Sequence, residues 1–388
     1  MSLDPGIIST LPSGSRIIDL RPLRSGWMKT VRIKARLPNG QTKFYFIKQA
    51  TDSSGREALV GRYVTLKAFS FLDSTIVTRV ENRPESRTDQ SREQTRVENR
   101  PESRTDQSRE QTRVENRPES RTDQSRETDQ ERETESSQKE REGTAAIPIY
   151  PISPLSFLIL EYVDTTKVVP APRDLCPRIA AIHLASVSPV ENQFGFPVSS
   201  YLAEFPQPVK WERKWTVFFA RLLESLCEFE CQAHGPWLKN HPGFRTLMDQ
   251  TVCNLLDPLE RDGRSIRPCL VHGNLSIDNA AFNAATGDLV LFSPAALYAH
   301  NEYELGMWRR KNATLSWSYF REYQMHISPS EPVYQWDDRI RLYSIQFNLA
   351  HVLVTPGTTD VQKQILDDID YLNEKYSLDA TGRAGGAI

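Results

Sequence analysis

The stretch "LVHGNLSIDNAAF", residues 270–282, decides the fold of this chain of 388 residues. The apolar residues at its start indicate a short strand, and "GDLVL", residues 287–291, indicates the next one. The loop between them carries a His-Gly pair, His272 and Gly273, followed by Asn274 and, five positions later, by Asn279. Polar side chains on a loop held between buried strands are typical of a functional site. The sequence therefore predicts a strand-loop-strand unit with a functional site in its loop.

Short strands are also expected near the start of the chain. Residues 15–20, 28–36 and 43–49 are rich in β-branched and aromatic residues and alternate apolar with polar positions. The segment "LPNGQ", residues 37–41, contains the Asn-Gly pair of a tight hairpin turn. Residues 55–69 then place apolar side chains at helical spacing, so we expect a helix after the strands.

A charged repeat follows this helix. From Thr78 the chain reads "TRVENRPESRTDQSREQ", and it repeats this unit of 17 residues from Thr95 and from Thr112. Each copy carries four arginines, four acidic residues, one proline and one valine. Such a unit buries too little apolar surface to offset its ordering entropy. Residues 78–143 are therefore predicted to be a disordered insertion, either a solvated product of tandem duplication or a charged interaction arm.

The remainder of the chain reads as one more strand followed by helices. Residues 156–164 form a continuous apolar segment, which we interpret as the last strand of the small sheet. Apolar stripes with helical spacing then predict helices. The expected helices cover residues 176–188, 212–234, 244–260, around 302–325, 337–354 and 360–376. The segments "PCLVHG" and "GDLVLFSP" interrupt them with strand character.

This order of elements resembles the protein-kinase-like bilobal fold, an α+β class. A small β-rich N-lobe is joined by a hinge to a helical C-lobe, and the catalytic loop lies among the helices. The expected parts are the first section of the N-lobe (1–77), the insertion (78–143), the final strand and hinge (144–165), the C-lobe with its catalytic loop (166–376) and a flexible tail (377–388).

Phosphoryl transfer from ATP needs a lysine on the phosphates, a carboxylate that holds this lysine, a base and oxygen ligands for magnesium. Lys48, in "YFIKQA", lies on the third expected strand, where such a lysine points into the cleft, although a surface lysine at a strand end fits equally well. Arg62 stands at the helix position of the partner glutamate and would repel Lys48. Glu57 lies five residues earlier, on a different face of the helix.

The other candidate site residues are mostly neutral. Asn274 stands where the base is needed, and an amide cannot take a proton. Asn279 can ligate magnesium through its amide oxygen, whereas Ser293 replaces the second metal ligand with a weak hydroxyl. Asp278 is expected to turn away from the metal position. Gly26 is the single glycine of the segment that would form the phosphate loop, which is a weak signal.

The chain resembles the fructosamine/ketosamine 3-kinase family, and in particular its fungal protein-ribulosamine 3-kinase-like branch. The family hallmark is His-Gly-Asp-Leu-Trp followed by an asparagine and then by a strand that ends in aspartate. Here it stands as "HGNLSIDN" and "FSPA". Further matching segments are "YFIKQA", "VGRYVTLKA", "ENQFGFPVS" (191–199), "WERKWTVFFARLL" (211–223), "YAHNEYELGMWR" (298–309) and "WDDRIRLYSIQFNLAH" (336–351). The resemblance covers the chain outside residues 78–143.

The resemblance implies a fold like that of the aminoglycoside phosphotransferases and the use of ATP and magnesium. It implies phosphorylation of the 3-hydroxyl of ketosamines on glycated lysines, which leads to protein deglycation. Lys48 would contact the phosphates near Gly26, and Asn279 would be a metal ligand. The departures from the family are Arg62 for the helix glutamate, Asn274 for the base, Ser293 for the metal aspartate and Ser276 for the loop tryptophan.

These departures predict a catalytically impaired kinase, a pseudokinase. Three hypotheses stay open at this point. The first is an active ribulosamine kinase, and the second is an inactive homologue that still binds a nucleotide or a glycated amine. The third is a non-enzymatic interaction protein on a kinase-like scaffold.

Composition limits the expected partners and location. The net charge of −2 gives no argument for nucleic acid or for an anionic membrane. The most apolar segment, residues 154–163, is far shorter than the ~20 residues of a membrane span, and no signal peptide is recognised. Five scattered cysteines favour buried thiols in a reducing compartment over a metal site. We expect a cytoplasmic monomer whose partner is a ketosamine or a glycated protein.

Overall fold

The computed structural model describes most of the chain on either side of the repeat. The described residues are 5–23, 28–75, 156–311, 313–315, 317–355 and 357–377, and all of them belong to one compact unit. The predicted insertion, residues 78–143, and Gly26 lie outside the described residues. The expected tail after residue 376 also lies outside them, apart from Ser377.

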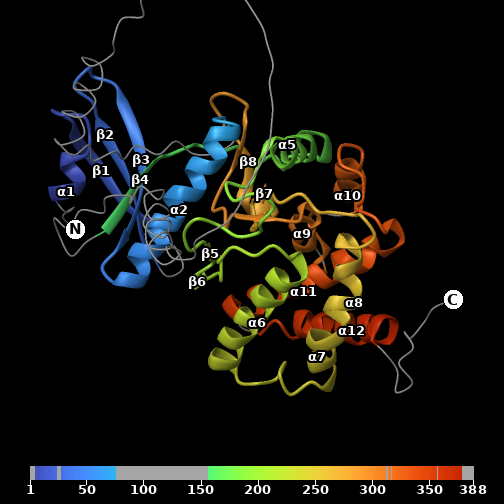
Figure 1. The fold of residues 1–388 in the computed structure, drawn as a ribbon. Helices are drawn as coiled ribbons and strands as arrows, with labels where there is room; N and C mark the ends of the chain where they lie inside the picture. The colour runs from blue at the N-terminus through green and yellow to red at the C-terminus, as the bar shows by residue number, and fades with distance from the viewer. Residues whose placement is uncertain are drawn as a thin grey trace, which may run out of the picture. The chain divides into compact units, whose positions relative to one another are not determined.

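The N-terminal part is a four-stranded antiparallel sheet in the order β1-β2-β3-β4 (Figure 1). Its strands are β1 (Arg16–Leu23), β2 (Lys29–Arg36), β3 (Thr42–Ala50) and β4 (Ser156–Glu161). The β2–β3 hairpin closes at Gly40, whose φ of 82° places it in the left-handed region that the Asn-Gly sequence favours. Strands β1, β2 and β3 confirm the prediction from apolar alternation, and β4 confirms the prediction from the continuous apolar segment.

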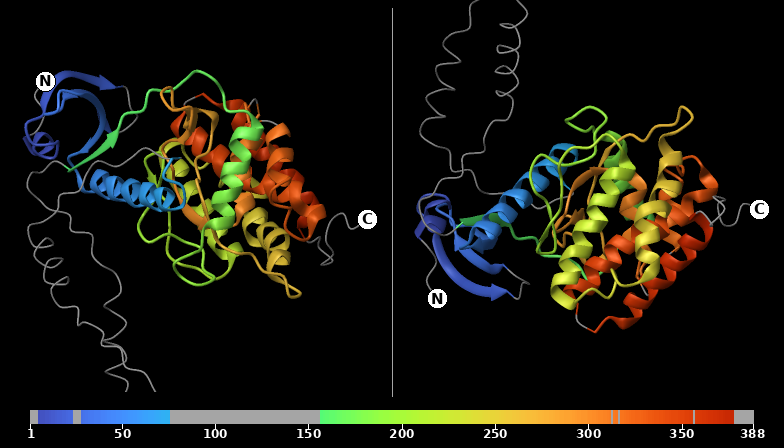
Figure 2. Two further views of the ribbon diagram at one scale, coloured as in Figure 1. Left: turned by 90° about the horizontal axis from the view of Figure 1, so that it is seen from above. Right: turned by 60° about the horizontal axis from the view of Figure 1, so that its bottom comes forward.

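One face of this sheet is covered by α1 (Pro5–Ser9), a helix that the sequence pattern did not predict. Ile7 of α1 is fully buried against the sheet. This small core comprises Ile7, Leu11, Val31, Ile33, Ala35, Tyr45, Ile47 and Ile159. The helix is a single short turn, too short for an apolar period to be recognised in the sequence. Figure 2 shows how strongly the sheet curves around this core.

Helix α2 (Ser53–Leu72) follows β3 and contacts β3 and β4. Its first turn is capped by Asp52, whose carboxylate accepts a hydrogen bond from the backbone N–H of Gly55 at 2.7 Å. Its buried face consists of Ala58, Leu59, Thr65, Leu66 and Phe69, together with Gly55 and Gly61. Helix α2 therefore joins the sheet to the main hydrophobic core.

The C-terminal part is helical, as predicted. Its helices are α5 (Pro172–Ala185), α6 (Trp215–His234), α7 (Pro242–Thr246), α8 (Val252–Leu256), α9 (Asn301–Leu305), α10 (Trp317–Gln324), α11 (Trp336–Val354) and α12 (Thr359–Tyr376). The predicted apolar stripe of α6 is buried along its whole length and ends at Leu226. Helix α11 packs against α6 and α12 in the centre of this part (Figure 1).

Two of the expected helical stretches are broken. The segment predicted as one helix over residues 244–260 consists of α7, a π-helical turn (Leu247–Thr251), α8 and a 3-10 turn (Asp257–Glu260). The apolar period continues through these turns, so it could not reveal changes in hydrogen-bond register. Residues 302–325 likewise contain α9, a 3-10 turn and the separate helix α10.

The predicted strand-loop-strand unit is present as two small two-stranded sheets. β7 (Cys269–Val271) pairs with β10 (Leu297–Ala299), and β8 (Ala280–Phe282) pairs with β9 (Leu289–Leu291). The loop of interest lies between β7 and β8. Among the described helices, none is long and apolar enough to cross a membrane.

The close contact of α2 with the rest of the core gives a first prediction. A Cβ atom added at Gly61 would lie 2.2 Å from the carbonyl oxygen of Ser199. Helix propensity alone would make Gly61→Ala stabilising by about 1 kcal/mol. We expect the opposite sign, because forced overpacking costs about 1–3 kcal/mol. Chemical denaturation measures this difference, and Lys67→Ala on the exposed face of α2 is the matched control. A stabilised Gly61→Ala protein would contradict this packing.

Candidate functional site

A buried carboxylate holds the loop after β7 in place. Glu304 of α9 is fully buried, and its side chain accepts hydrogen bonds from the backbone N–H groups of His272 and Gly273. Gly273 has a φ of 69°, and a Cβ atom at this position would lie 2.4 Å from the carbonyl oxygen of Ala295. The loop thus depends on glycine at this position and on the carboxylate beneath it.

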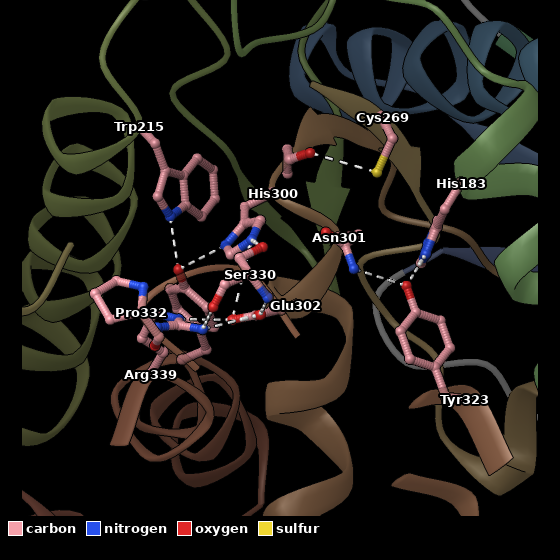
Figure 3. Close-up of polar contacts among 12 residues, drawn as sticks. His183, Trp215, Cys269, His300, Asn301, Glu302, Tyr323, Ser330, Pro332 and Arg339 are labelled. Carbon is pink, nitrogen blue, oxygen red and sulfur yellow. Dashed lines mark hydrogen bonds and ion pairs between the residues drawn. The ribbon is translucent and has the colours of Figure 1, made fainter. Parts of the chain in front are cut away.

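A second buried network lies next to this anchor and is drawn in Figure 3. Arg339 of α11 and Glu302 of α9 form a fully buried ion pair, with Nε and Oε2 2.7 Å apart. Arg339 also donates to the carbonyl oxygens of Ser330 and Pro332, so its guanidinium group is paired on several sides. A buried ion pair needs such extra hydrogen bonds to offset the desolvation of both charges.

The same network extends to α6 and to β10. His300 donates to or accepts from the hydroxyl of Tyr343 at 3.0 Å and that of Ser330 at 2.9 Å, and Trp215 donates to Tyr343 at 2.8 Å. On the other side of Figure 3, the hydroxyl of Tyr323 bonds the ring of His183 at 2.7 Å. These contacts tie α6 to α11 and α5 to α10, on either side of the helix α9 that carries Glu304.

The side chains of the loop bond to the loop itself. The amide nitrogen of Asn274 donates to the carbonyl oxygen of Ser293 at 3.0 Å. The amide nitrogen of Asn279 donates to the carbonyl oxygen of Asn274 at 2.7 Å, which leaves its own amide oxygen as a potential ligand. The structure therefore brings together Asn274, Asn279 and Ser293, the three candidate residues from this region. Asp278 is exposed.

Ser293 has an unusual backbone conformation. Its φ of 51° lies in the left-handed region, which costs most L-residues about 1–2 kcal/mol. Asn and Asp tolerate this region better than serine does. Strained backbone conformations concentrate at functional sites. The turn at Ser293 thus has a backbone conformation that asparagine or aspartate adopts more readily than serine does.

Lys48 lies in β3 opposite Thr30 of β2 and Leu158 of β4, neither of which is charged. Its Nζ atom lies 5.7 Å from the ring centroid of Phe46, its neighbour on the same face of the sheet. Burial, together with the positive charge of Arg62, lowers the pKa of Lys48 to about 7. Arg62 therefore adds to the effect of burial, and no acidic group of the described residues counters it in the pKa of Lys48.

Arg62 occupies the middle of the buried face of α2. The other members of this face lie at spacings of three, four and seven residues from it: Ala58, Leu59, Thr65, Leu66 and Phe69. Burial lowers the pKa of Arg62, and its Nε atom is buried without a hydrogen-bond partner in the described part of the chain. Glu57 is exposed, with its carboxylate 3.5 Å from the hydroxyl of Tyr201.

Burial also determines the charge of the loop histidine. His272 is fully enclosed, its ring centroid lies 5.8 Å from that of Phe69, and desolvation lowers its pKa to about 4. The imidazole is therefore neutral at physiological pH, and its Nδ1 atom accepts a hydrogen bond from the backbone N–H of Asn274. His272 supports the loop and does not supply a charge to it.

The candidate site therefore combines two cations with neutral polar groups. Magnesium prefers carboxylate oxygens and phosphate oxygens. Among the described residues, no group of three or more His, Cys, Asp or Glu side chains is arranged to hold a metal ion. Asn279 offers one amide oxygen and Ser293 one hydroxyl. These residues do not fit a magnesium site of the kind that the family resemblance implies.

The comparisons with known proteins agree with this architecture. The sequence profile described as fructosamine kinase matches residues 127–371, more than half of the chain. The chain belongs to the fructosamine kinase family. It is 27% identical over 216 residues to the chloroplastic protein-ribulosamine 3-kinase of Oryza sativa subsp. japonica, which covers 55% of this chain and 58% of that protein. It is 30% identical over 165 residues to the ketosamine-3-kinase of Mus musculus, which covers 41% of this chain and 48% of that protein.

These alignments span less than two thirds of either relative. Solved structures show the fold over nearly the whole chain. A candidate fructosamine-3-kinase from Haemophilus somnus superposes with a TM-score of 0.60 at 15% identity, covering 92% of each chain. A second candidate, from Thermobifida fusca, has a TM-score of 0.58 at 16% identity and covers 95% of this chain and 98% of its own. The predicted family and the protein-kinase-like fold class are thus confirmed.

Sequence reasoning missed the role of Glu304. Glu302 and Glu304 both lie in α9, beyond the loop in sequence. The structure shows that both are buried and structural. The available signal was the presence of two acidic residues among the apolar residues of "YAHNEYELGMW". Carboxylates are almost never fully buried unless they are paired, so acidic residues in a buried segment indicate specific partners.

The loop anchor gives the second prediction. Glu304→Ala leaves the N–H groups of His272 and Gly273 buried without a partner, so we expect a loss of more than about 3 kcal/mol in unfolding free energy. Glu304→Gln keeps one acceptor oxygen and should lose about 1–3 kcal/mol. Urea denaturation measures both. Glu224→Gln, on the exposed side of α6, is the control and should change stability by less than about 0.5 kcal/mol.

The third prediction concerns pH. The unfolded chain keeps Lys48 protonated up to a pKa of 10.5, whereas the folded protein releases this proton near pH 7. Between these values the unfolded state binds more protons, so the contribution of Lys48 to stability rises with pH. We expect the stability of the natural protein relative to Lys48→Met to increase from pH 7 to pH 10. A difference that is flat over this range would contradict the burial of a charged Lys48 beside Arg62.

Proposed function

We propose that the protein is a fructosamine kinase family member whose nucleotide cleft persists but whose phosphoryl transfer is lost or strongly impaired. The observation that supports this most directly is an intact loop frame with no carboxylate at Arg62, Asn274 or Ser293. Glu304 and the Glu302–Arg339 ion pair hold the loop in place. The side chains at the reacting positions are neutral at Asn274 and Ser293 and positively charged at Arg62.

The magnitudes favour impairment over slow activity. Loss of a general base lowers a rate by roughly 10²–10⁴, and a kinase turning over at ~1–100 per second would remain measurable after such a loss. Loss of the metal carboxylate removes the neutralisation of charge on the phosphoryl group, which is usually the larger effect. Such groups act as a unit, so their separate costs are not summed.

The relatives suggest the substrate class. The rice and mouse proteins are named protein-ribulosamine 3-kinase and ketosamine-3-kinase. We propose that the cleft derives from a site for ATP and for a ketosamine on a glycated protein, with Lys48 toward the phosphates. An interaction protein without any ligand in this cleft is the competing function.

The fourth prediction tests the proposed function by restoring the lost groups. The triple variant Arg62→Glu, Asn274→Asp, Ser293→Asp should transfer phosphate from ATP to a ribulosamine-bearing peptide in the presence of magnesium, and the natural protein should not. The left-handed backbone of residue 293 accommodates aspartate. Asn274→Asp loses the hydrogen bond to the Ser293 carbonyl, at a cost of about 1 kcal/mol. Mass spectrometry of the peptide gives the readout.

The control is the same triple variant with Lys48→Met, which should lose the restored activity. Comparable transfer by the natural protein would contradict the proposed impairment. No transfer by either protein, with both folded, would favour the interaction protein.

A further inference from the structure

Arg62 lies on the face of α2 that packs against the rest of the protein. It stands at the centre of the buried stripe of α2, and Phe69, seven residues later, is on the same face of the helix. Phe69 packs against His272 of the loop, with ring centroids 5.8 Å apart. Arg62 therefore projects toward the region between the sheet and the loop. Its Nε atom finds no partner there among the described residues.

Lys48 approaches the same region from the sheet. Side chains alternate between the two faces of β3, so Lys48 shares a face with Phe46 and Ala50, whereas Ile47 faces the small core under α1. Helix α2 packs against β3 and β4, so the face of α2 that carries Arg62 and the face of β3 that carries Lys48 meet in one region. Two partly buried cations thus share this region, and no acidic group of the described residues counters the charge of Arg62 at Lys48.

Such a pair is unfavourable by itself. Burying a charge is costly unless the charge is paired, and like charges in contact add to this cost. A bound anion removes both penalties at once. Arginine offers planar donors that match phosphate oxygens, and lysine adds a compact charge. The chemistry of the pair therefore fits a polyphosphate.

We propose that Lys48 and Arg62 form a metal-independent site for a nucleoside triphosphate, bound as the free anion and not as its magnesium complex. This inference rests on the proposed function, because it takes the cleft between the sheet and the loop as the nucleotide site. Arg62 would neutralise phosphate charge that magnesium neutralises in an active kinase. Asn274, Asn279 and Ser293 bring no negative charge that would repel the free anion.

The sign of the magnesium effect distinguishes this site from a kinase site. In a kinase, metal carboxylates and the nucleotide share the metal ions, so magnesium strengthens binding. Here magnesium would compete with the two cations for the same phosphate oxygens. We expect ATP to bind at least about tenfold more tightly in EDTA than in excess magnesium. A tenfold change in affinity corresponds to about 1.4 kcal/mol of binding free energy.

The test is calorimetric titration of the full chain with ATP at constant ionic strength, in EDTA and in excess magnesium chloride. Arg62→Glu should lose at least about tenfold in affinity for ATP in EDTA. If Arg62→Glu does not fold, Arg62→Gln replaces it in the test. Arg62→Gln removes the charge without reversing it and should also bind ATP more weakly. Lys67→Glu makes the same charge reversal on the exposed face of α2 and should bind ATP as the natural protein does.

Further probes separate the two sources of the anion. ATP, ADP and adenosine report on the base, and inorganic tripolyphosphate reports on the phosphates alone. Binding of tripolyphosphate equal to that of ATP supports an anion site that does not recognise the base. ATP that binds more tightly than tripolyphosphate supports a nucleotide site. Adenosine that binds as well as ATP would overturn the proposal.

Two other results would overturn it: ATP that binds more tightly with magnesium than with EDTA, or no binding of ATP in EDTA by the folded protein. Neither depends on phosphoryl transfer. The proposed impairment fails when the natural protein phosphorylates the ribulosamine peptide, whereas the metal-independent site fails in the binding experiment. The two failures are therefore distinguishable.

Discussion

The hydrogen bonds from the backbone of His272 and Gly273 to the carboxylate of Glu304 are the constraint on which the candidate site depends. They anchor the loop to the helical core. The side chains of Asn274 and Asn279 bond instead to the carbonyl groups of Ser293 and Asn274, within the site itself. Glu304 in turn is fully enclosed by the helical core. The position of the loop thus follows from the packing of the helices around a buried charge.

This arrangement shows how the proposed loss of reacting side chains could leave the structure of the loop intact. Loss of Glu304 or of Arg339 would leave buried polar groups without partners, which costs several kcal/mol and threatens the fold. Asn274, Asn279 and Ser293 are only partly buried, so exchange of their side chains costs little stability. A chain can therefore lose the reacting carboxylates while it keeps the loop that carried them. The left-handed turn at Ser293 is consistent with such a history.

Under the proposed function, the charge balance of the candidate site differs from that of an active kinase. A kinase cleft combines a lysine with carboxylates that hold metal ions. In this chain burial, and after it the positive charge of Arg62, lowers the pKa of Lys48. Perturbed titratable groups in a partly buried region are typical of binding sites. The cleft of this protein therefore favours an anion that arrives without its metal.

The sequence by itself determined the strands of the sheet, the long helices α2, α6, α11 and α12, and the family. These features depend on local periodicity and on the spacing of motifs, which are readable along the chain. It also placed Lys48, Arg62, Asn274, Asn279 and Ser293 as candidates. Helix α1 was not predictable, because it is too short to show an apolar period. The π turn after α7 was not predictable, because the apolar period continues through it.

Only the tertiary structure decided the roles of Glu304 and Arg62. Glu304 is 32 residues from His272, and no local pattern reports a hydrogen bond between a side chain and a backbone so distant in sequence. The sequence predicted that Arg62 would repel Lys48, but the partial burial of both side chains follows only from the packing of a helix on a strand. Charges act through space, and their energy is set by burial and by neighbours from other elements, which the order of residues does not contain.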